Sequence, residues 1–239
     1  MKEPSNKIIN EIPLEKANKL LKEKSAQQRL LWAYDKFKDQ FALTTSFGIQ
    51  SSVLLHLAQC LKEKDIFPKI IWVDTGYLPK ETYIYAEKLI KLLDLKIETA
   101  QSKYSPAHME AIFGKLWEKS SEDFQKYHQI RKVDPLEYKL KKFKILCWAT
   151  GVRGNQTKHR STMNFFDITR GKYSLRPLLD WTTKDIYYYM QKNNLPQHPL
   201  FEKGYSSVGD WHSSGPDTEE IKGRKTRFGG KNEECGIHL

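Results

Sequence analysis

The sequence has no apolar run of membrane-spanning length and no apolar block near Met1 that resembles a signal peptide. It also has only three cysteines, an odd number at unrelated spacings, which argues against a disulfide framework. Disulfides persist in oxidising compartments and are rare in reducing ones. We therefore expect a cytoplasmic protein that does not associate with membranes.

The sequence also lacks a concentrated block of charge. Its net charge of +11 comes from 40 basic and 29 acidic residues, and the lysines are scattered from Lys2 to Lys231. No strip of clustered basic and aromatic residues supports a nucleic-acid-binding protein, which would show salt-sensitive RNA affinity. We favour a lysine-rich solvated surface that contains a local site for a small anion.

One stretch, residues 41–57, organises the chain. Phe41 to Thr45 is an apolar and β-branched run typical of a buried strand, and an amphipathic helix follows a turn through Ser46, Phe47 and Gly48. Such a turn aims backbone N–H groups and hydroxyls at one point, at the positive end of the helix dipole, which suits a phosphate. An ordinary strand–helix connection explains this stretch equally well when it is taken alone.

Further strands and helices alternate along the chain. Buried strands are predicted at residues 69–76, 95–99 and 144–150, with helices between them and a hairpin over residues 166–175. This alternation predicts an α/β fold with a mainly parallel sheet flanked by helices, in a chain long enough for one such domain with an appendage. Ligands bind at the carboxyl ends of parallel strands, where residues 46–52, 74–76 and 151–160 all lie.

Residues 151–160 hold two arginines, a lysine, a histidine and two glycines directly after a predicted strand. The planar guanidinium of arginine suits bidentate capture of phosphate or sulfate. A solvated basic loop is the alternative for such a segment in isolation, and its place at the strand ends favours an anion site. The aromatic run of residues 187–189 lies in a helix opened by a capping box at Thr182 and Asp185, and we interpret it as packing in the core rather than as a platform for a nucleobase.

We divide the chain into a helical lead-in (residues 1–40), a nucleotide-binding α/β domain (residues 41–205) and a loop with a C-terminal tail (residues 206–239). Cys60 and Cys147 lie in apolar runs and are interpreted as inert packing residues. Cys235 is the only cysteine outside such a run. An accessible thiol on a tail can act as a nucleophile and later be reached by a second protein.

Five motifs that occur in order resemble those of the assimilatory sulfonucleotide reductase family, specifically the cluster-free 3′-phosphoadenylylsulfate (PAPS) reductases. They are Ser46-Phe-Gly-Ile-Gln-Ser51, Val73-Asp-Thr-Gly76, Gly151-Val-Arg153 through Arg160, Gly204-Tyr-Ser-Ser-Val-Gly-Asp210 and Glu234-Cys-Gly-Ile-His238. The resemblance runs from about residue 30 to the C-terminus. The phosphate loop also occurs in ATP-pyrophosphatases, whereas the terminal motif is highly specific.

The resemblance implies an adenine-nucleotide α-hydrolase-like (Rossmann-like) fold and the reduction of PAPS to sulfite and adenosine 3′,5′-bisphosphate. It also implies thioredoxin or glutaredoxin as the electron donor, and a homodimer. Cluster-bearing adenylylsulfate reductases of this family have four cysteines at the positions held here by Tyr127, His128, Asp210 and Ser213. Four thiolates are needed to hold such a cluster, so we expect no iron–sulfur cofactor and no metal.

The resemblance also assigns candidate roles to residues. Cys235 is the expected catalytic nucleophile, which attacks the sulfur of the substrate. Phosphate and sulfate oxygens would be held by the first loop and the arginine segment: Ser46, Phe47, Gly48, Gln50, Ser51, Ser52, Arg153, Gln156 and Arg160. Asp74, Thr75 and Gly76 would hold the adenosine, Arg227 would offset the acidic residues beside the thiol, and His238 would assist or anchor the tail.

Two other enzymes remain open at this point. A cluster-free adenylylsulfate reductase would share every motif and differ only in its substrate. An ATP-pyrophosphatase-type nucleotidyltransferase would share the fold and the phosphate loop but would have no use for Cys235. One departure from the family pattern is Gly154, where a second arginine often follows the first.

Overall fold

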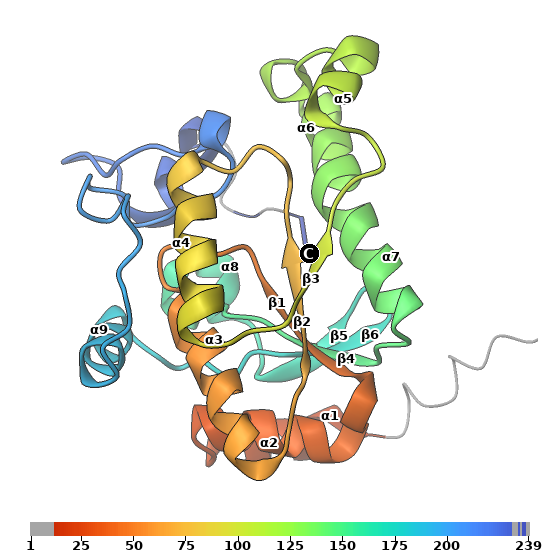
Figure 1. Ribbon diagram of the computed structural model, residues 1–239, viewed down its shortest axis with the longest axis vertical. Coiled ribbons are helices and arrows are strands. Elements are labelled where there is room, and N and C mark those ends of the chain that lie inside the picture. Colours follow the sequence, from red (N-terminus) through yellow and green to blue (C-terminus); the bar gives the residue numbers. More distant parts are fainter. Residues whose placement is uncertain (1–11, 231–233, 235, 238–239) are drawn as a thin grey trace, which may run out of the picture.

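The computed structural model describes residues 12–230, 234, 236 and 237 (Figure 1). Within this part of the chain, six strands form one sheet in the order β3-β2-β1-β4-β6-β5. The strands are β1 (Phe41–Thr45), β2 (Lys69–Val73), β3 (Ile97–Ala100), β4 (Cys147–Ala149), β5 (Phe166–Thr169) and β6 (Lys172–Leu175). Every neighbouring pair is parallel except β5 with β6, which form the predicted hairpin.

The α-helices lie between and around these strands. They are α1 (Leu14–Lys22), α2 (Ala26–Phe37), α3 (Ser51–Gln59), α4 (Lys80–Leu92), α5 (Pro106–Phe113), α6 (Ser121–His128), α7 (Asp134–Lys142), α8 (Lys158–Ser161) and α9 (Thr183–Lys192). A π-helical segment, Gln129–Val133, joins α6 to α7, and short 3₁₀ helices cover Trp211–Ser213 and Gly223–Gly230. None of the helices in the described part of the chain combines the length and the apolarity needed to cross a membrane.

Side chains alternate across the sheet, and each face has its own helices. In β1, Leu43 packs in the core shared with α1 to α4 and α9, whereas Ala42 faces the smaller cluster built on Leu136 and Leu140 of α7. Figure 1 accordingly shows α3 and α4 on one side of the strands and α7 on the other. Because both faces are covered, the central strands are apolar on both faces, and the polar side chains collect at their ends.

The fold class predicted from the sequence is confirmed, with small shifts in position. The third strand begins two residues later than expected, at Ile97. The capping box of α9 is present, since Thr182 and Asp185 exchange hydrogen bonds between side chain and backbone. The expectation that the aromatic run of α9 packs in the core is wrong for two of its members, because Tyr187 and Tyr188 are 51% and 55% exposed.

The two cysteines of the apolar runs differ in their burial. Cys147 on β4 is fully buried, as expected for an inert core residue. Cys60 is only partly buried, because it begins the 3₁₀ turn that follows α3 and its sulfur lies beside the ring of His56. The interpretation of Cys60 as a core residue is therefore wrong.

Candidate active site

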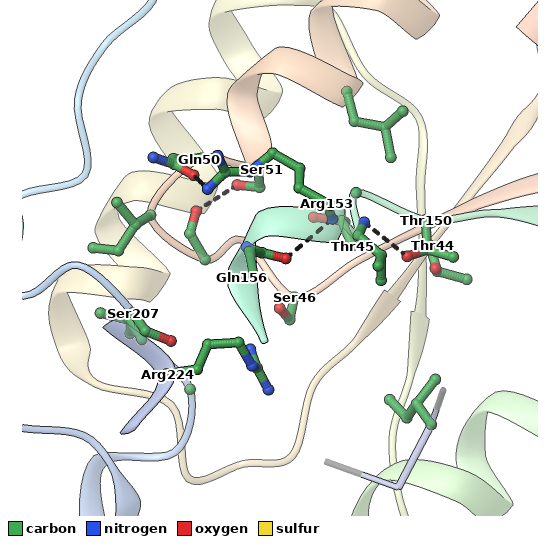
Figure 2. Close-up of a pocket in the computed structure, with 18 of the residues that line it drawn as sticks. Thr44, Thr45, Ser46, Gln50, Ser51, Thr150, Arg153, Gln156, Ser207 and Arg224 are labelled. Carbon is green, nitrogen blue, oxygen red and sulfur yellow. Dashed lines mark hydrogen bonds between the residues drawn. The ribbon is translucent and has the colours of Figure 1, made fainter. Parts of the chain in front are cut away.

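A cavity of about 210 Å³ opens at the carboxyl ends of β1, β2 and β4. Its walls come from the loop after β1, from Thr75 after β2 and from the segment after β4, and it is closed by residues 206–210, Arg224, Arg227 and Ile237. Figure 2 shows side chains from several of these segments around one space, with Ser46, Gln156, Ser207 and Arg224 among them. The parallel strands bring these segments together because successive strands end at the same edge of the sheet.

The loop after β1 is shaped by local hydrogen bonds. Phe47 has a positive φ of 49°, which lets its N–H bond to Thr45 Oγ1 at 3.0 Å while its ring packs edge-on against Trp72. Ser51 begins α3, and its hydroxyl donates to the carbonyl of Gly48 at 2.8 Å. The N-terminus of α3 therefore faces the cavity and contributes partial positive charge there.

Arg153, Gln156 and Arg160 form a linked group in the part of the wall that follows β4. The side-chain oxygen of Gln156 accepts from the backbone N–H of Arg153 at 3.1 Å and from Arg160 Nη1 at 2.5 Å. Arg153 also donates to the side chains of Gln50 and Thr183. Burial, followed by the charge of Arg160, lowers the pKa of Arg153 to about 10, so it stays protonated at neutral pH.

The guanidinium of Arg160 forms an ion pair with a carboxylate from the C-terminal tail. Nε and Nη2 of Arg160 each lie 2.8 Å from an oxygen of Glu234, and Thr157 Oγ1 donates to the same carboxylate at 3.0 Å. Burial acts to raise the pKa of Glu234, but the hydrogen bonds and charge of Arg160 outweigh it, and the pKa is lowered overall. The tail therefore places a bidentate carboxylate on Arg160, which is itself part of the cavity wall.

The remaining wall contains a buried ion pair. Lys132 Nζ lies 2.6 Å from Asp210 Oδ2, with the two side chains 7% and 1% exposed, and Thr75 Oγ1 donates to the other carboxylate oxygen at 2.5 Å. Burial acts to raise the pKa of Asp210, but Lys132 and Thr75 hold it far below its usual range. Nearby, Arg227 Nε donates to the carbonyl of Ser213 at 3.1 Å.

The charges that line the cavity are strongly unbalanced. Among the lining residues, five side chains are cationic and only Asp210 is acidic; the five are Lys132, Arg153, Arg160, Arg224 and Arg227. Three of these cations form ion pairs with two carboxylates of the described residues: Lys132 pairs with Asp210, and Arg160 and Arg224 both pair with Glu234. The cavity still carries excess positive charge beside hydroxyl and backbone donors, which suits a ligand with several negative charges.

Most of the side chains predicted from the sequence meet at this cavity. Those that line it are Ser46, Gly48, Gln50, Ser51, Thr75, Arg153, Gln156, Arg160 and Arg227. Cys235 and His238 lie outside the described residues. Their predicted roles stay predictions, although Ile237 lines the cavity and Glu234 contacts Arg160, which also lines it.

Four predicted residues do not line the cavity. The ring of Phe47 and the side chain of Ser52 are fully buried. Both carboxylate oxygens of Asp74 accept protein hydrogen bonds, from the N–H of Gly76, the hydroxyl of Tyr83 and the amide of Gln101. Gly76 itself lies under the guanidinium of Arg131. Phe47, Asp74 and Gly76 therefore shape the loops that border the site, and Ser52 is a buried residue of α3.

The sequence reasoning missed several residues that line the cavity. They are Thr44, Thr45, Lys132, Thr150, Ser207, Asp210 and Arg224. The hydroxyls at this edge could have been found, since β1 ends in Thr44 and Thr45 and Thr150 directly follows β4, at the edge where ligands bind. Lys132 lies in the helical region between β3 and β4, and Arg224 lies far along the chain near the C-terminus, so only the folded structure brings them to the site.

The fold and this site define an α/β protein of the adenine-nucleotide α-hydrolase-like type, with a cationic cavity at the carboxyl ends of its strands. Candida glabrata FMN adenylyltransferase in complex with FAD and inorganic pyrophosphate shares the fold, with a TM-score of 0.61 and 12% identity over 97% of this chain and 81% of that one. A model of the phosphoadenosine phosphosulfate reductase domain matches residues 40–216, well over half of the chain. The chain belongs to the phosphoadenosine phosphosulfate reductase family.

Relatives across the family support this assignment. Phosphoadenosine 5′-phosphosulfate reductase of Synechococcus sp. is 46% identical over 95% of this chain and 97% of its own length. The enzyme of the same name from Zymomonas mobilis is 42% identical over 97% and 94%. The crystal structure of phosphoadenylyl-sulfate (PAPS) reductase from Candida auris, a phosphate complex, has a TM-score of 0.70 and 26% identity over 84% of this chain and 95% of that chain.

Proposed function

We propose that this protein reduces 3′-phosphoadenylylsulfate to sulfite and adenosine 3′,5′-bisphosphate in assimilatory sulfate reduction, with Cys235 as the nucleophile. One observation carries the proposal. The tail residue next to Cys235, Glu234, pairs with Arg160 in the wall of a cationic cavity at the strand ends. The residue that precedes the proposed nucleophile in the sequence therefore contacts the anion site directly.

The substrate carries about four negative charges once its phosphates are ionised, which the cavity is suited to balance. The hydroxyl of Ser46, the N-terminus of α3 and the hydroxyl of Ser51, once it turns away from the carbonyl of Gly48, would bind oxygens of one anionic group. Arg153 and Arg160 would bind those of a second group, with Gln156 holding both arginines in place. Binding would exchange the Glu234 carboxylate on Arg160 for a phosphate or sulfate group.

The chemistry we propose moves two electrons through the thiol. The Cys235 thiolate attacks the sulfur of the phosphosulfate, a sulfur–sulfur bond forms, and the bridging sulfur–oxygen bond breaks. Adenosine 3′,5′-bisphosphate leaves with the electron pair, because the arginines stabilise its charge. The product on the protein is a Cys235 S-sulfonate.

A second protein supplies the electrons, and we propose thioredoxin or glutaredoxin. A donor thiolate attacks the Cys235 sulfur, and sulfite leaves with the electron pair of the sulfur–sulfur bond. The second donor thiol then resolves the mixed disulfide, which restores the Cys235 thiol and leaves the donor oxidised. We also propose that the protein is cytoplasmic, where such donors stay reduced, and that it is a homodimer.

We propose that this cycle needs no iron–sulfur cluster. The four positions at which cluster-bearing relatives have cysteines come together in the fold, but they hold Tyr127, His128, Asp210 and Ser213. Asp210 is paired with Lys132, and Ser213 donates to the backbone carbonyl of Asp210 at 3.2 Å. A cluster needs four thiolates, and these side chains supply none.

The decisive experiment is to incubate the reduced protein with PAPS and weigh it intact. We expect a sulfonate adduct on Cys235, followed by sulfite release when reduced thioredoxin is added. Cys235→Ser should abolish both while nucleotide binding stays nearly intact, and Cys60→Ser is the matched control that should retain both. Sulfite formation by Cys235→Ser would refute the mechanism.

The same experiment separates the alternatives. Repeating it with adenylylsulfate tests the 3′-phosphate preference, since a cluster-free adenylylsulfate reductase would form the adduct at least as readily with that substrate. A nucleotidyltransferase would release pyrophosphate from ATP and form no adduct. An adduct that forms preferentially with PAPS would support the proposed substrate.

A further inference from the structure

The hairpin between β5 and β6 has an unfavourable residue in its turn. Its two-residue loop consists of Arg170 and Gly171, whose φ angles are 55° and 65°. Two positive φ angles define a type I′ turn, in which Asn-Gly is strongly preferred. A long side chain such as arginine is disfavoured in this left-handed conformation, so the turn chemistry alone does not account for Arg170.

The side chain of Arg170 reaches the C-terminal tail. Its Nη2 donates to the carbonyl of Gly236 at 2.5 Å, and its Nε donates to the carbonyl of Ile237 at 3.3 Å. The third nitrogen, Nη1, donates to Glu137 on α7 at 3.0 Å, which holds the guanidinium in place. One planar group therefore binds two successive carbonyls, and this fixes the orientation of the backbone there as well as its position.

The same part of the tail is seated by packing. Ile237 lines the cavity and packs against the apolar cluster of Val73, Trp148 and α7. Gly236 has a φ of 75°, so the chain turns at this residue in a conformation that glycine adopts readily. On the other side of Cys235, Glu234 is held by Arg160. Described contacts thus hold the tail both before and after residue 235.

We propose that Arg170 is a positioning residue that seats the tail so that Cys235 faces the anion cavity. This inference rests on the proposed role of Cys235. Arg160 belongs to the cavity and must also serve the substrate, whereas Arg170 lies in the hairpin, is absent from the cavity wall and contacts the tail through its backbone carbonyls. Arg170 therefore affects how the nucleophile is positioned, whereas the affinity for the nucleotide depends on the residues of the cavity.

The test is Arg170→Asn, because asparagine is the residue that the turn itself prefers. The melting temperature should stay the same or rise, while kcat for sulfite formation falls by roughly 10- to 100-fold because the thiol is less well placed. The dissociation constant for adenosine 3′,5′-bisphosphate should stay within about twofold of wild type. Arg170→Lys, which can reach only one carbonyl, should retain an intermediate kcat.

The matched control is Lys141→Ala, which removes an exposed positive charge from the same helix as Glu137 and should leave kcat unchanged. An unchanged kcat in Arg170→Asn would overturn the proposal, and so would a loss confined to nucleotide affinity. Hydrogen exchange of the C-terminal peptide tests the contact without any turnover. Exchange should be faster in Arg170→Asn than in wild type, and equal rates would overturn the proposed role of Arg170 in holding the tail.

These readouts keep the two hypotheses separate. If the wild-type protein forms no sulfonate adduct with PAPS, the proposed function fails. Faster exchange in Arg170→Asn would then still support the tail contact. If the wild type forms the adduct and Arg170→Asn forms it at the same rate, only the positioning role fails.

Discussion

His128 makes the stability of this protein sensitive to acid. Its ring is 5% exposed and packs against Phe124 and Phe228, with centroids 4.4 and 5.4 Å away. Burial, followed by the positive charge of Lys132, lowers the pKa of His128 to about 3. The imidazole of the folded protein therefore stays neutral near pH 6.5, where an exposed histidine takes up its proton.

The sign and size of the effect follow from proton linkage. The pKa in the unfolded chain is about 6.5, so between about pH 6.5 and pH 3 the unfolded state binds the proton that the folded state does not. Stability therefore falls as the pH drops through this window. At pH 5 the difference is about 1.5 pH units, which at about 1.4 kcal/mol per unit amounts to about 2 kcal/mol.

Replacing the ring removes this dependence. We expect His128→Gln to lose about 2 kcal/mol less of its free energy of unfolding than wild type between pH 7.5 and pH 5, whatever its absolute stability. Urea unfolding at a series of pH values measures this difference. The control is His108→Gln, which removes an exposed histidine and should keep the wild-type slope. An unchanged slope in His128→Gln would refute the burial argument.

Three further substitutions probe the charges of the cavity. Arg160→Ala should weaken binding of adenosine 3′,5′-bisphosphate by roughly 2 kcal/mol or more, because a phosphate of the bound nucleotide would then be buried without its cation. Calorimetry measures this loss, and an unchanged dissociation constant would contradict the role of Arg160. Glu234→Gln should strengthen binding of inorganic phosphate by about tenfold, because the carboxylate no longer competes for Arg160, and weaker binding would count against this competition. Asp210→Asn should cost about 3–5 kcal/mol in urea unfolding, since it leaves Lys132 buried without its counter-ion; a loss below about 1 kcal/mol would show that the pair is not stabilising.

Much of the fold could be predicted because its signals are local. The apolar runs of β1 and β2, the amphipathic helices between strands, the hairpin and the capping box of α9 each depend on residues only a few positions apart. The rule that parallel strands end at one edge then brought Ser46, Thr75 and Arg153 together without any knowledge of distances. The wrong prediction for the aromatic run of α9 arose because burial depends on contacts that are not local in the sequence. Tyr187 and Tyr188 lie on a face of α9 that the described part of the chain leaves exposed, and hydrophobic character alone does not say which face is covered.

The sequence by itself determined the order of strands and helices, the phosphate loop, the arginine segment and the cysteine that we propose as nucleophile. The first three follow from periodicity, turn chemistry and residue type, which are properties of short segments, and the role of the cysteine follows from the resemblance of its motif to the family. Only the tertiary structure decided that Lys132 pairs with Asp210, that Glu234 occupies Arg160 and that Arg170 holds the carbonyls of Gly236 and Ile237. Each of these contacts joins residues more than 60 positions apart, and their partners are selected by how the helices pack on the sheet.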